Sequence, residues 1–147
     1  AREGHDPVPR FVEPALSPAS PAARDFPLVL TSAKVVHYCH GQHRHVPSLR
    51  RRVPDPLVSL HPDTAAARGI ADGDWVEIVS GNGSVRMRAR FDRALDPRVV
   101  AAQYGWWQDN RPLSMPGYDP LRASGANFNM LVSDRFADPV SGSNQVS

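Results

Sequence analysis

Cysteine and lysine are both nearly absent from this chain. Cys39 is the only cysteine, so the fold cannot depend on an internal disulfide. Lys34 is the only lysine among 17 basic residues, and the formal net charge is only +2. A nucleic-acid-binding surface usually requires a larger and more clustered basic excess, so we expect no nucleic-acid partner. The forked side chain of arginine instead suits phosphate or carboxylate groups.

Long apolar runs and familiar catalytic motifs are also missing. No stretch approaches the roughly 18 apolar residues needed to cross a bilayer, so we expect no direct membrane insertion. Residues 1–10 are polar and do not resemble a signal peptide. We expect any targeting signal to lie outside this sequence, in a longer parent protein, and we assign no compartment. No nucleophile elbow, P-loop, dinucleotide-binding glycine motif or CxxC pair occurs, so no residue is assigned as catalytic.

Proline divides the chain into two parts. Many of the 15 prolines lie in residues 1–26, where no apolar periodicity survives. Because proline removes a backbone donor and favours extended neighbours, we predict that residues 1–26 form a linker arm lying on another surface. The chain is 41% apolar and 22% charged, which is typical of a folded domain. We place that single domain at residues 27–147.

Short alternating segments dominate the middle of the chain. A Pro-Asp pair at residues 62–63 predicts the start of a short helix, and Gly69 predicts its end. Residues 75–79 and 84–91 alternate apolar and polar side chains around a Gly-Asn-Gly turn, which predicts a hairpin. Further strands are predicted at residues 28–30, 57–60 and 99–103. The pattern predicts a mainly β fold with short helices and long loops.

A polar loop rich in histidine follows the first predicted strand. Its metal-ligand types are His37, Cys39, His40, His43 and His45. Zinc sites usually combine two ligand clusters from separate segments, and this loop offers one, so we assign no metal site. A small metal-binding module built on the His37–His45 loop stays an alternative. The same region carries donors suited to a phosphate or a heterocycle edge, namely Ser32, Gln42 and Arg44.

Three arginines share the outward face of residues 84–91. Arg86, Arg88 and Arg90 alternate with apolar residues, as expected for the exposed side of a strand. We favour a solvated face, or a face docked on a partner's carboxylates. A basic nucleic-acid-binding β-barrel that uses this stripe is the second alternative.

Two later segments offer groups that could face a ligand. Trp106 and Trp107 are adjacent, so in an extended chain they point to opposite faces. One is then expected in the core, and the other over a ligand or partner. Asn127 and Asn129 lie at the start of a short predicted helix, residues 127–132. A simple helix N-cap is the preferred interpretation, and a polar or anionic ligand is the alternative.

Six segments in a fixed order carry a family resemblance. They read LVLTS, HYCHGQHRHVPSLRR, PDPLVSLHPDTAAARGIADGDWVEIVSGNGSVRMRARF, VVAAQYGWW, ANFNMLVSD and DPVSGS, and they cover about residues 27–144. This order resembles the molybdopterin dinucleotide-binding C-terminal domain of the dimethyl-sulfoxide-reductase family of molybdenum and tungsten oxidoreductases. The HGQHRHVPSLR loop and the GWW segment resemble the branch that contains thiosulfate and polysulfide reductases, formate-dehydrogenase-like proteins and acetylene hydratase.

The resemblance implies a fold and a ligand. The fold would be a six-stranded double-psi β-barrel that clamps one guanylyl molybdopterin of a bis-molybdopterin guanine dinucleotide cofactor. The residues implied to face this cofactor are Thr31, Ser32, His40, Gln42, His43, Arg44, Trp106, Trp107, Asn127 and Asn129. Many family members have Gly-Arg after the threonine, where this chain has Ser32-Ala33, so no arginine contact is expected at that point.

The resemblance also implies that the chain works as part of a larger enzyme. The metal and any iron–sulfur cluster would be held by other domains, so we predict that this chain is inactive alone. Its partners would be the remaining domains of the parent large subunit and, beyond them, electron-transfer subunits.

Overall fold

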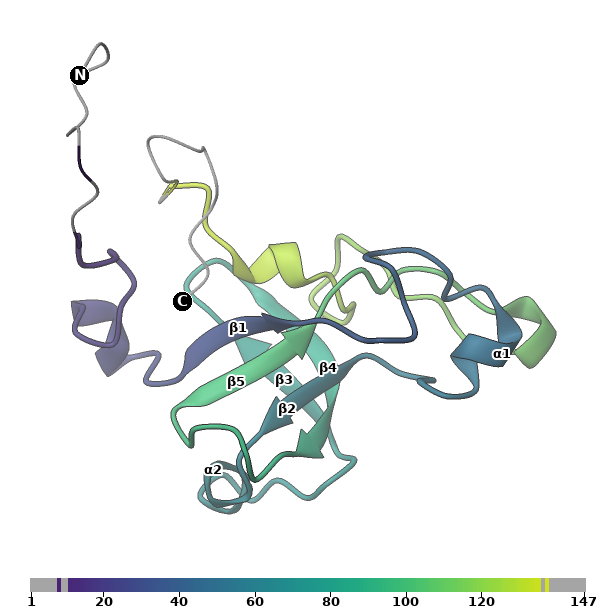
Figure 1. The fold of residues 1–147 in the computed structure, drawn as a ribbon, viewed down its shortest axis with the longest axis horizontal. Coiled ribbons are helices and arrows are strands. Elements are labelled where there is room, and N and C mark those ends of the chain that lie inside the picture. Colours follow the sequence, from purple (N-terminus) through teal and green to yellow (C-terminus); the bar gives the residue numbers. More distant parts are fainter. Residues whose placement is uncertain (1–7, 9–10, 136, 138–147) are drawn as a thin grey trace, which may run out of the picture.

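The computed structural model describes residues 8, 11–135 and 137, and its centre is a five-stranded mixed sheet (Figure 1). The strand order is β1-β5-β2-β4-β3. The strands are β1 (Val29–Ala33), β2 (Leu57–Leu60), β3 (Trp75–Val79), β4 (Ser84–Phe91) and β5 (Val99–Gln103). The mainly β prediction is confirmed. The expected six-stranded closed barrel is not, because within the described residues the sheet has five strands, with β1 and β3 at its open edges.

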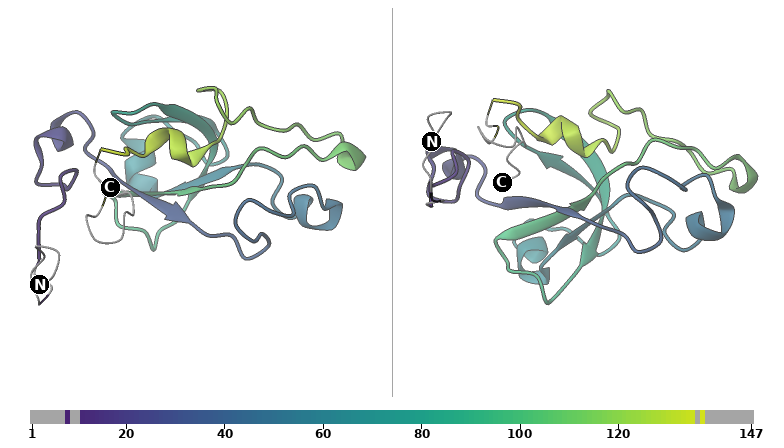
Figure 2. Two further views of the ribbon diagram at one scale, coloured as in Figure 1. Left: turned by 90° about the horizontal axis from the view of Figure 1, so that it is seen from above. Right: turned by 45° about the horizontal axis from the view of Figure 1, so that its top comes forward.

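The sheet mixes parallel and antiparallel pairs. β1 pairs with β5 and β2 with β4 in parallel, whereas β2–β5 and β3–β4 are antiparallel. The sheet curls around a core to which β4 contributes Val85, Met87 and Ala89, all at most 2% exposed (Figure 2). Alternation places these three residues and Phe91 inside. The prediction is confirmed for the three, and Phe91, at the end of β4, is half-buried.

Helices are few and short. They are η1 (Pro21–Arg24), α1 (Pro47–Arg50), α2 (Pro62–Ala66), η2 (Arg111–Leu113) and η3 (Phe128–Leu131). α2 was predicted with its end at Gly69, which has a left-handed φ of +64°. The amide of Ile70 donates to the Ala65 carbonyl at 3.0 Å and closes the helix end. In the part of the chain that the structure describes, no helix is long and apolar enough to span a membrane.

The chain segments after β1 and β5 leave the sheet together and form a projecting lobe, residues 37–53 and 104–118 (Figures 1 and 2). They do so because β1 and β5 are parallel, with Ala33 paired to Gln103, so both strands end at the same edge. The Tyr38 hydroxyl donates to the Val53 carbonyl at 2.7 Å and closes one half of the lobe. The sheet topology thus brings together two polar segments that are far apart in sequence.

A hydrogen-bonded brace ties the lobe to the sheet. The Tyr118 hydroxyl donates to Asp55 Oδ1 at 3.1 Å, and Arg88 Nη1 donates to Asp55 Oδ2 at 3.0 Å. Burial raises the pKa of the Tyr118 hydroxyl above its ordinary value, and the negative charge of Asp55 raises it further. The folded chain therefore holds this tyrosine in its protonated form.

Replacing Tyr118 with phenylalanine is expected to lower the free energy of unfolding by about 1.5–3 kcal/mol, the range for a hydrogen bond to a charged group. Above about pH 10 the unfolded tyrosine ionises while the folded one stays protonated. Stability of the wild type should therefore fall as pH rises through this range, and Tyr118→Phe should reduce the fall. Urea unfolding between pH 7 and 11 measures both effects. Tyr104→Phe is the control, since that hydroxyl makes no hydrogen bond among the described residues; equal losses in both variants would contradict the account.

Candidate functional site

A hollow of about 300 Å³ lies where the lobe meets the segment before η3. Its lining residues are Gly41, Tyr104, Gly105, Trp106, Trp107, Pro120, Asn127, Phe128 and Asn129. Three of the segments that carry the family resemblance meet here: the histidine loop, the GWW segment and the asparagine segment. We refer to this feature as the hollow.

Two glycines form the floor of the hollow, where two backbone segments cross. Gly105 has a left-handed φ of +78°, and a Cβ built on it would lie 2.6 Å from the Cα of Gly41. A Cβ on Gly41 would collide with the ring of Trp107. The close crossing of the backbones therefore requires the absence of a side chain at Gly105, whereas a side chain at Gly41 would displace the Trp107 ring. Sequence reasoning did not single out either glycine; the signal available was their place within the HGQ and YGWW motifs.

The two adjacent tryptophans divide between core and surface, as predicted. Trp106 is 1% exposed, and its Nε1 donates to Gln103 Oε1 at 3.0 Å. Its ring makes edge contacts with Tyr38 and Tyr118 at centroid distances of 5.6 and 6.1 Å. Trp107 is 49% exposed at the side of the hollow. The face available for stacking belongs to Trp107, while Trp106 is enclosed.

The asparagine segment begins η3. Asn127 Oδ1 accepts a hydrogen bond from the amide of Asn129 at 3.2 Å, and its Nδ2 donates to the Pro120 carbonyl at 2.8 Å. The N-cap interpretation is therefore confirmed for Asn127. The side chain of Asn129 is exposed and lines the hollow. Of the two amides, Asn129 is the one that can meet a ligand without breaking the cap.

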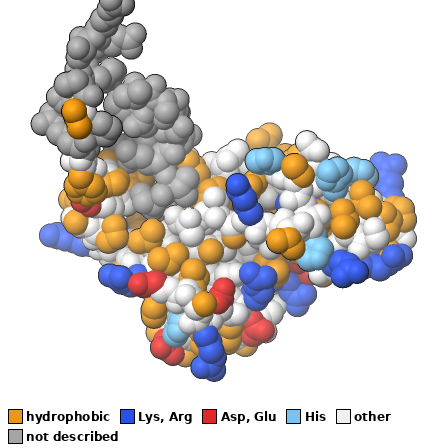
Figure 3. Space-filling view, in the orientation of Figure 1, with side chains coloured by type: hydrophobic (Ala, Val, Ile, Leu, Met, Phe, Trp, Pro, Cys, Tyr) orange, Lys and Arg blue, Asp and Glu red, His pale blue; other side chains and the backbone are white. Residues whose placement is uncertain are grey.

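The histidine loop presents polar groups at the lobe surface. His40, Gln42 and His43 are all exposed, and Figure 3 shows histidine and arginine side chains gathered over the lobe. His40 and His43 have left-handed φ values of +48° and +73°, which are uncommon outside glycine and cluster at functional sites. Among the described residues, no three histidine, cysteine or acidic side chains lie together to hold a metal ion. The geometry thus gives the metal-module alternative no support.

Arg44 differs from the sequence-based expectation. It was expected to meet phosphates or the pterin, but it is 1% exposed. Its guanidinium donates to the carbonyls of His40 and Tyr104, both at 2.7 Å. It also lies over the rings of Tyr38 and Trp106, at 4.5 and 4.7 Å from their centroids. Aromatic rings and backbone carbonyls draw the side chain inward, so a direct ligand contact would require it to leave this position.

Thr31 and Ser32 lie on the edge strand β1 and are exposed. They do not line the hollow, so the structure does not bring them together with the other expected residues.

The arginine stripe of β4 is largely engaged with its own fold. Arg88 bonds to Asp55, and Arg90 Nη2 donates to Ser59 Oγ at 2.8 Å. Arg86 and Arg88 also lie about the ring of Trp75, at 5.9 and 6.0 Å from its centroid. These contacts favour an ordinary protein surface over a phosphate-binding one.

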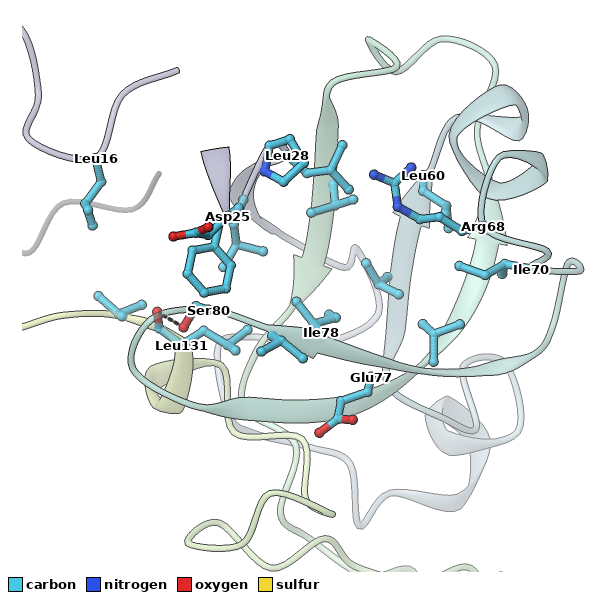
Figure 4. A pocket seen from close by; sticks show the side chains of 18 of the residues that line it. Leu16, Asp25, Leu28, Leu60, Arg68, Ile70, Glu77, Ile78, Ser80 and Leu131 are labelled. Carbon is cyan, nitrogen blue, oxygen red and sulfur yellow. Dashed lines mark hydrogen bonds between the residues drawn. The ribbon is translucent and has the colours of Figure 1, made fainter. Parts of the chain in front are cut away.

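A larger cavity of about 430 Å³ lies elsewhere, against the start of β1 and the end of β3 (Figure 4). Aliphatic side chains such as Leu28, Leu60 and Ile78 point into it. Ser80, at its edge, donates to the Leu131 carbonyl at 3.0 Å. The cavity contains none of the expected site residues and lacks the clustered donors that a pyrophosphate requires. The hollow is therefore the better candidate site.

Comparisons with known proteins identify the family of the chain. The family model described as "Molydopterin dinucleotide binding domain" matches residues 28–147. The chain is 28% identical over 146 residues, 95% of its length, to dopamine dehydroxylase from Eggerthella lenta. It is 29% identical over 107 residues, 71% of its length, to acetylene hydratase from Syntrophotalea acetylenica. It covers only 13% and 15% of these two proteins.

A solved structure shares the fold. Acetylene hydratase from Pelobacter acetylenicus superimposes with a TM-score of 0.83 at 25% identity, over 99% of this chain and 20% of that one. The match of the family model over most of the chain and this likeness confirm the resemblance found in the sequence. The chain belongs to the molybdopterin dinucleotide-binding domain family of molybdenum and tungsten oxidoreductases, whose cofactor is molybdopterin guanine dinucleotide.

Proposed function

We propose that this chain is the C-terminal domain of a longer molybdenum or tungsten oxidoreductase and binds one guanylyl molybdopterin of a bis-dinucleotide cofactor at the hollow. The observation that carries the proposal is the meeting of three resemblance-bearing segments around one cavity. The similarity to acetylene hydratase supports a parent in the branch with acetylene hydratase, thiosulfate and polysulfide reductases and formate-dehydrogenase-like proteins.

The exposed groups around the hollow fit a dinucleotide. Trp107 offers a half-exposed ring against which a purine can stack, and the amide of Asn129 offers both donor and acceptor to a base edge. Of the histidine loop, only Gly41 lines the hollow. The exposed side chains on either side of it, His40, Gln42 and His43, supply donors for a pyrophosphate in the proposal. These chemistries match a guanosine joined to a pterin through two phosphates.

The other residues that the family resemblance implies at the cofactor have supporting roles in the proposed site. Thr31 and Ser32 extend the polar surface along β1. Arg44, Trp106 and Asn127 hold the hollow's walls rather than touch the ligand. The bound cofactor's metal supplies the redox chemistry, while this chain binds and orients the dinucleotide and is inactive alone.

The proposed enzyme has further domains and subunits beyond this chain. The chain covers at most a fifth of its matched relatives, so we infer that the remaining domains of a parent large subunit pack against it. Electron-transfer subunits belong to the same proposed assembly. The six-stranded double-psi barrel implied by the resemblance is likewise proposed for the domain within that assembly.

Binding of guanosine diphosphate to the 147-residue chain tests the proposal by calorimetric titration. Trp107→Ala and Asn129→Ala should each weaken binding about tenfold, because loss of base stacking or of a base-edge hydrogen bond costs on the order of 1–3 kcal/mol. Trp75→Ala is the matched control, since Trp75 is 42% exposed but lies outside the hollow. Binding that Trp75→Ala weakens as much as Trp107→Ala does would contradict the assigned site.

A further inference from the structure

Two arginines are enclosed in the lobe without an acidic partner among the residues that the structure describes. Arg44 is 1% exposed and Arg50 is 0% exposed. None of the ion pairs found among the described residues includes either of them. Burying a cation is costly unless other groups compensate it. The groups that contact the two guanidinium groups therefore indicate which backbone segments the two arginines hold together.

Aromatic rings and backbone carbonyls take the place of carboxylates. The ring of Trp106 lies beneath both guanidinium carbons, 4.7 Å from that of Arg44 and 5.0 Å from that of Arg50. Each guanidinium also lies over a tyrosine ring, Tyr38 for Arg44 and Tyr118 for Arg50, at 4.5 and 6.0 Å from the centroids. The hydrogen bonds of both groups go to main-chain oxygen atoms. A planar guanidinium can donate to several carbonyls in fixed directions while it stacks on a ring. Both side chains thus connect separate backbone segments by hydrogen bonds.

The carbonyls bound by Arg44 are those that flank the floor of the hollow. Its Nη1 donates to the carbonyl of His40 at 2.7 Å, immediately before Gly41. Its Nη2 donates to the carbonyl of Tyr104 at 2.7 Å, immediately before Gly105. One guanidinium therefore joins the two backbone segments at the point where they cross.

The carbonyls bound by Arg50 lie farther out in the lobe. Its Nε donates to Pro54 at 2.7 Å, and its Nη1 and Nη2 donate to Gln108 and Pro116, both at 3.0 Å. These contacts join the α1 end of the lobe to the hairpin-like segment that is closed by the Asn110–Met115 bridge. Arg50 makes no hydrogen bond to the crossing itself.

We propose that Arg44 is a positioning residue that sets the floor of the hollow by fastening the His40–Gly41 turn to the Tyr104–Gly105 segment, whereas Arg50 braces only the outer lobe. The consequence for ligand binding rests on the proposed function; the fastening itself does not. Arg44 acts on the dinucleotide through the backbone that it holds, and the left-handed φ of +48° at His40 is part of what it maintains.

Lysine substitutions at the two positions form a matched test. Each keeps the charge, but a single ammonium cannot reproduce the forked, planar geometry. In Arg44→Lys, the amides of Gln42 and Val46, bonded to Cys39 and His43 at 2.8 and 3.0 Å, should exchange with deuterium about tenfold faster. The amides of Asn110 and Met115 should keep their protection. Arg50→Lys should give the reverse pattern.

Ligand affinity supplies a second readout. Guanosine diphosphate should bind Arg44→Lys about tenfold more weakly than the wild type, and Arg50→Lys within about twofold of it. Faster exchange across the whole lobe in both variants, or no local change in Arg44→Lys, would overturn the positioning role. The expected exchange patterns without guanosine diphosphate binding by the wild type would support the positioning role and overturn the proposed function instead.

A third variant covers the case in which Arg44→Lys does not fold. Glycine at position 40 relieves the left-handed backbone that Arg44 holds. Because this strain is present in every folded background, His40→Gly should change the stability of Arg50→Lys as much as that of the wild type, but that of Arg44→Lys by a different amount, as followed by thermal unfolding. An equal change in all three proteins would overturn the proposal.

Discussion

Replacing Gly105 with alanine is expected to lower the free energy of unfolding by about 3 kcal/mol or more. The left-handed φ of +78° costs a residue with a side chain about 1–2 kcal/mol. The added Cβ would also lie 2.6 Å from the Cα of Gly41 and 3.0 Å from the carbonyl oxygen of His40. These are backbone atoms that cannot rotate away, and overpacking of this kind adds about 1–3 kcal/mol. Urea unfolding followed by tryptophan fluorescence measures the loss.

Gly69 provides a matched control for this prediction. It has a similar left-handed φ of +64°, but a Cβ built there meets nothing within 4 Å. Gly69→Ala should therefore show only the backbone cost of about 1–2 kcal/mol. If both variants lost the same free energy, the close crossing at the floor of the hollow would be contradicted.

Replacing Trp106 with alanine is expected to cost about 3–5 kcal/mol, the range for removing a fully buried large aromatic side chain. The ring is 1% exposed and packs against Tyr38 and Tyr118. Its loss would also leave the guanidinium groups of Arg44 and Arg50 without one of their compensating rings. We expect the lobe to lose its fixed structure in this variant, measured as lost near-ultraviolet circular dichroism and a lower denaturation midpoint.

Replacing the adjacent tryptophan, Trp107, is expected to weaken ligand binding with little effect on the free energy of unfolding. Trp107 is 49% exposed, so Trp107→Ala should cost within about 1 kcal/mol of unfolding free energy while weakening guanosine diphosphate binding. A loss of stability in Trp107→Ala as large as that in Trp106→Ala would contradict the division of the pair between core and surface.

Local patterns in the sequence were enough to predict the central elements. The helix closed at Gly69 and the hairpin of β3 and β4 depend on neighbouring residues, and both occur where predicted. β5 spans Val99–Gln103, as the apolar run indicated. Each of these elements is specified by residues within a few positions of one another, so one sequence carries the whole signal.

Features that depend on contacts between distant segments were harder to predict. The inward turn of Arg44 depends on the Tyr104 carbonyl, 60 residues away, and on the ring of Trp106. The need for glycine at position 105 arises from its left-handed φ and from the crossing with Gly41, neither of which the neighbouring residues reveal. Residue type marked Arg44 as a phosphate donor, but its environment decides which oxygen atoms it meets. The same limit applies to the six-stranded barrel, which came from the resemblance rather than from any local pattern.

Amide chemical-shift mapping of the 147-residue chain with guanosine diphosphate tests the central claim most directly. The account predicts that shifts cluster at residues 40–43, 105–107 and 127–129, around the hollow. Shifts confined to the Arg86–Arg90 face of β4 would contradict it, because they would indicate non-specific binding of an anion to a basic surface.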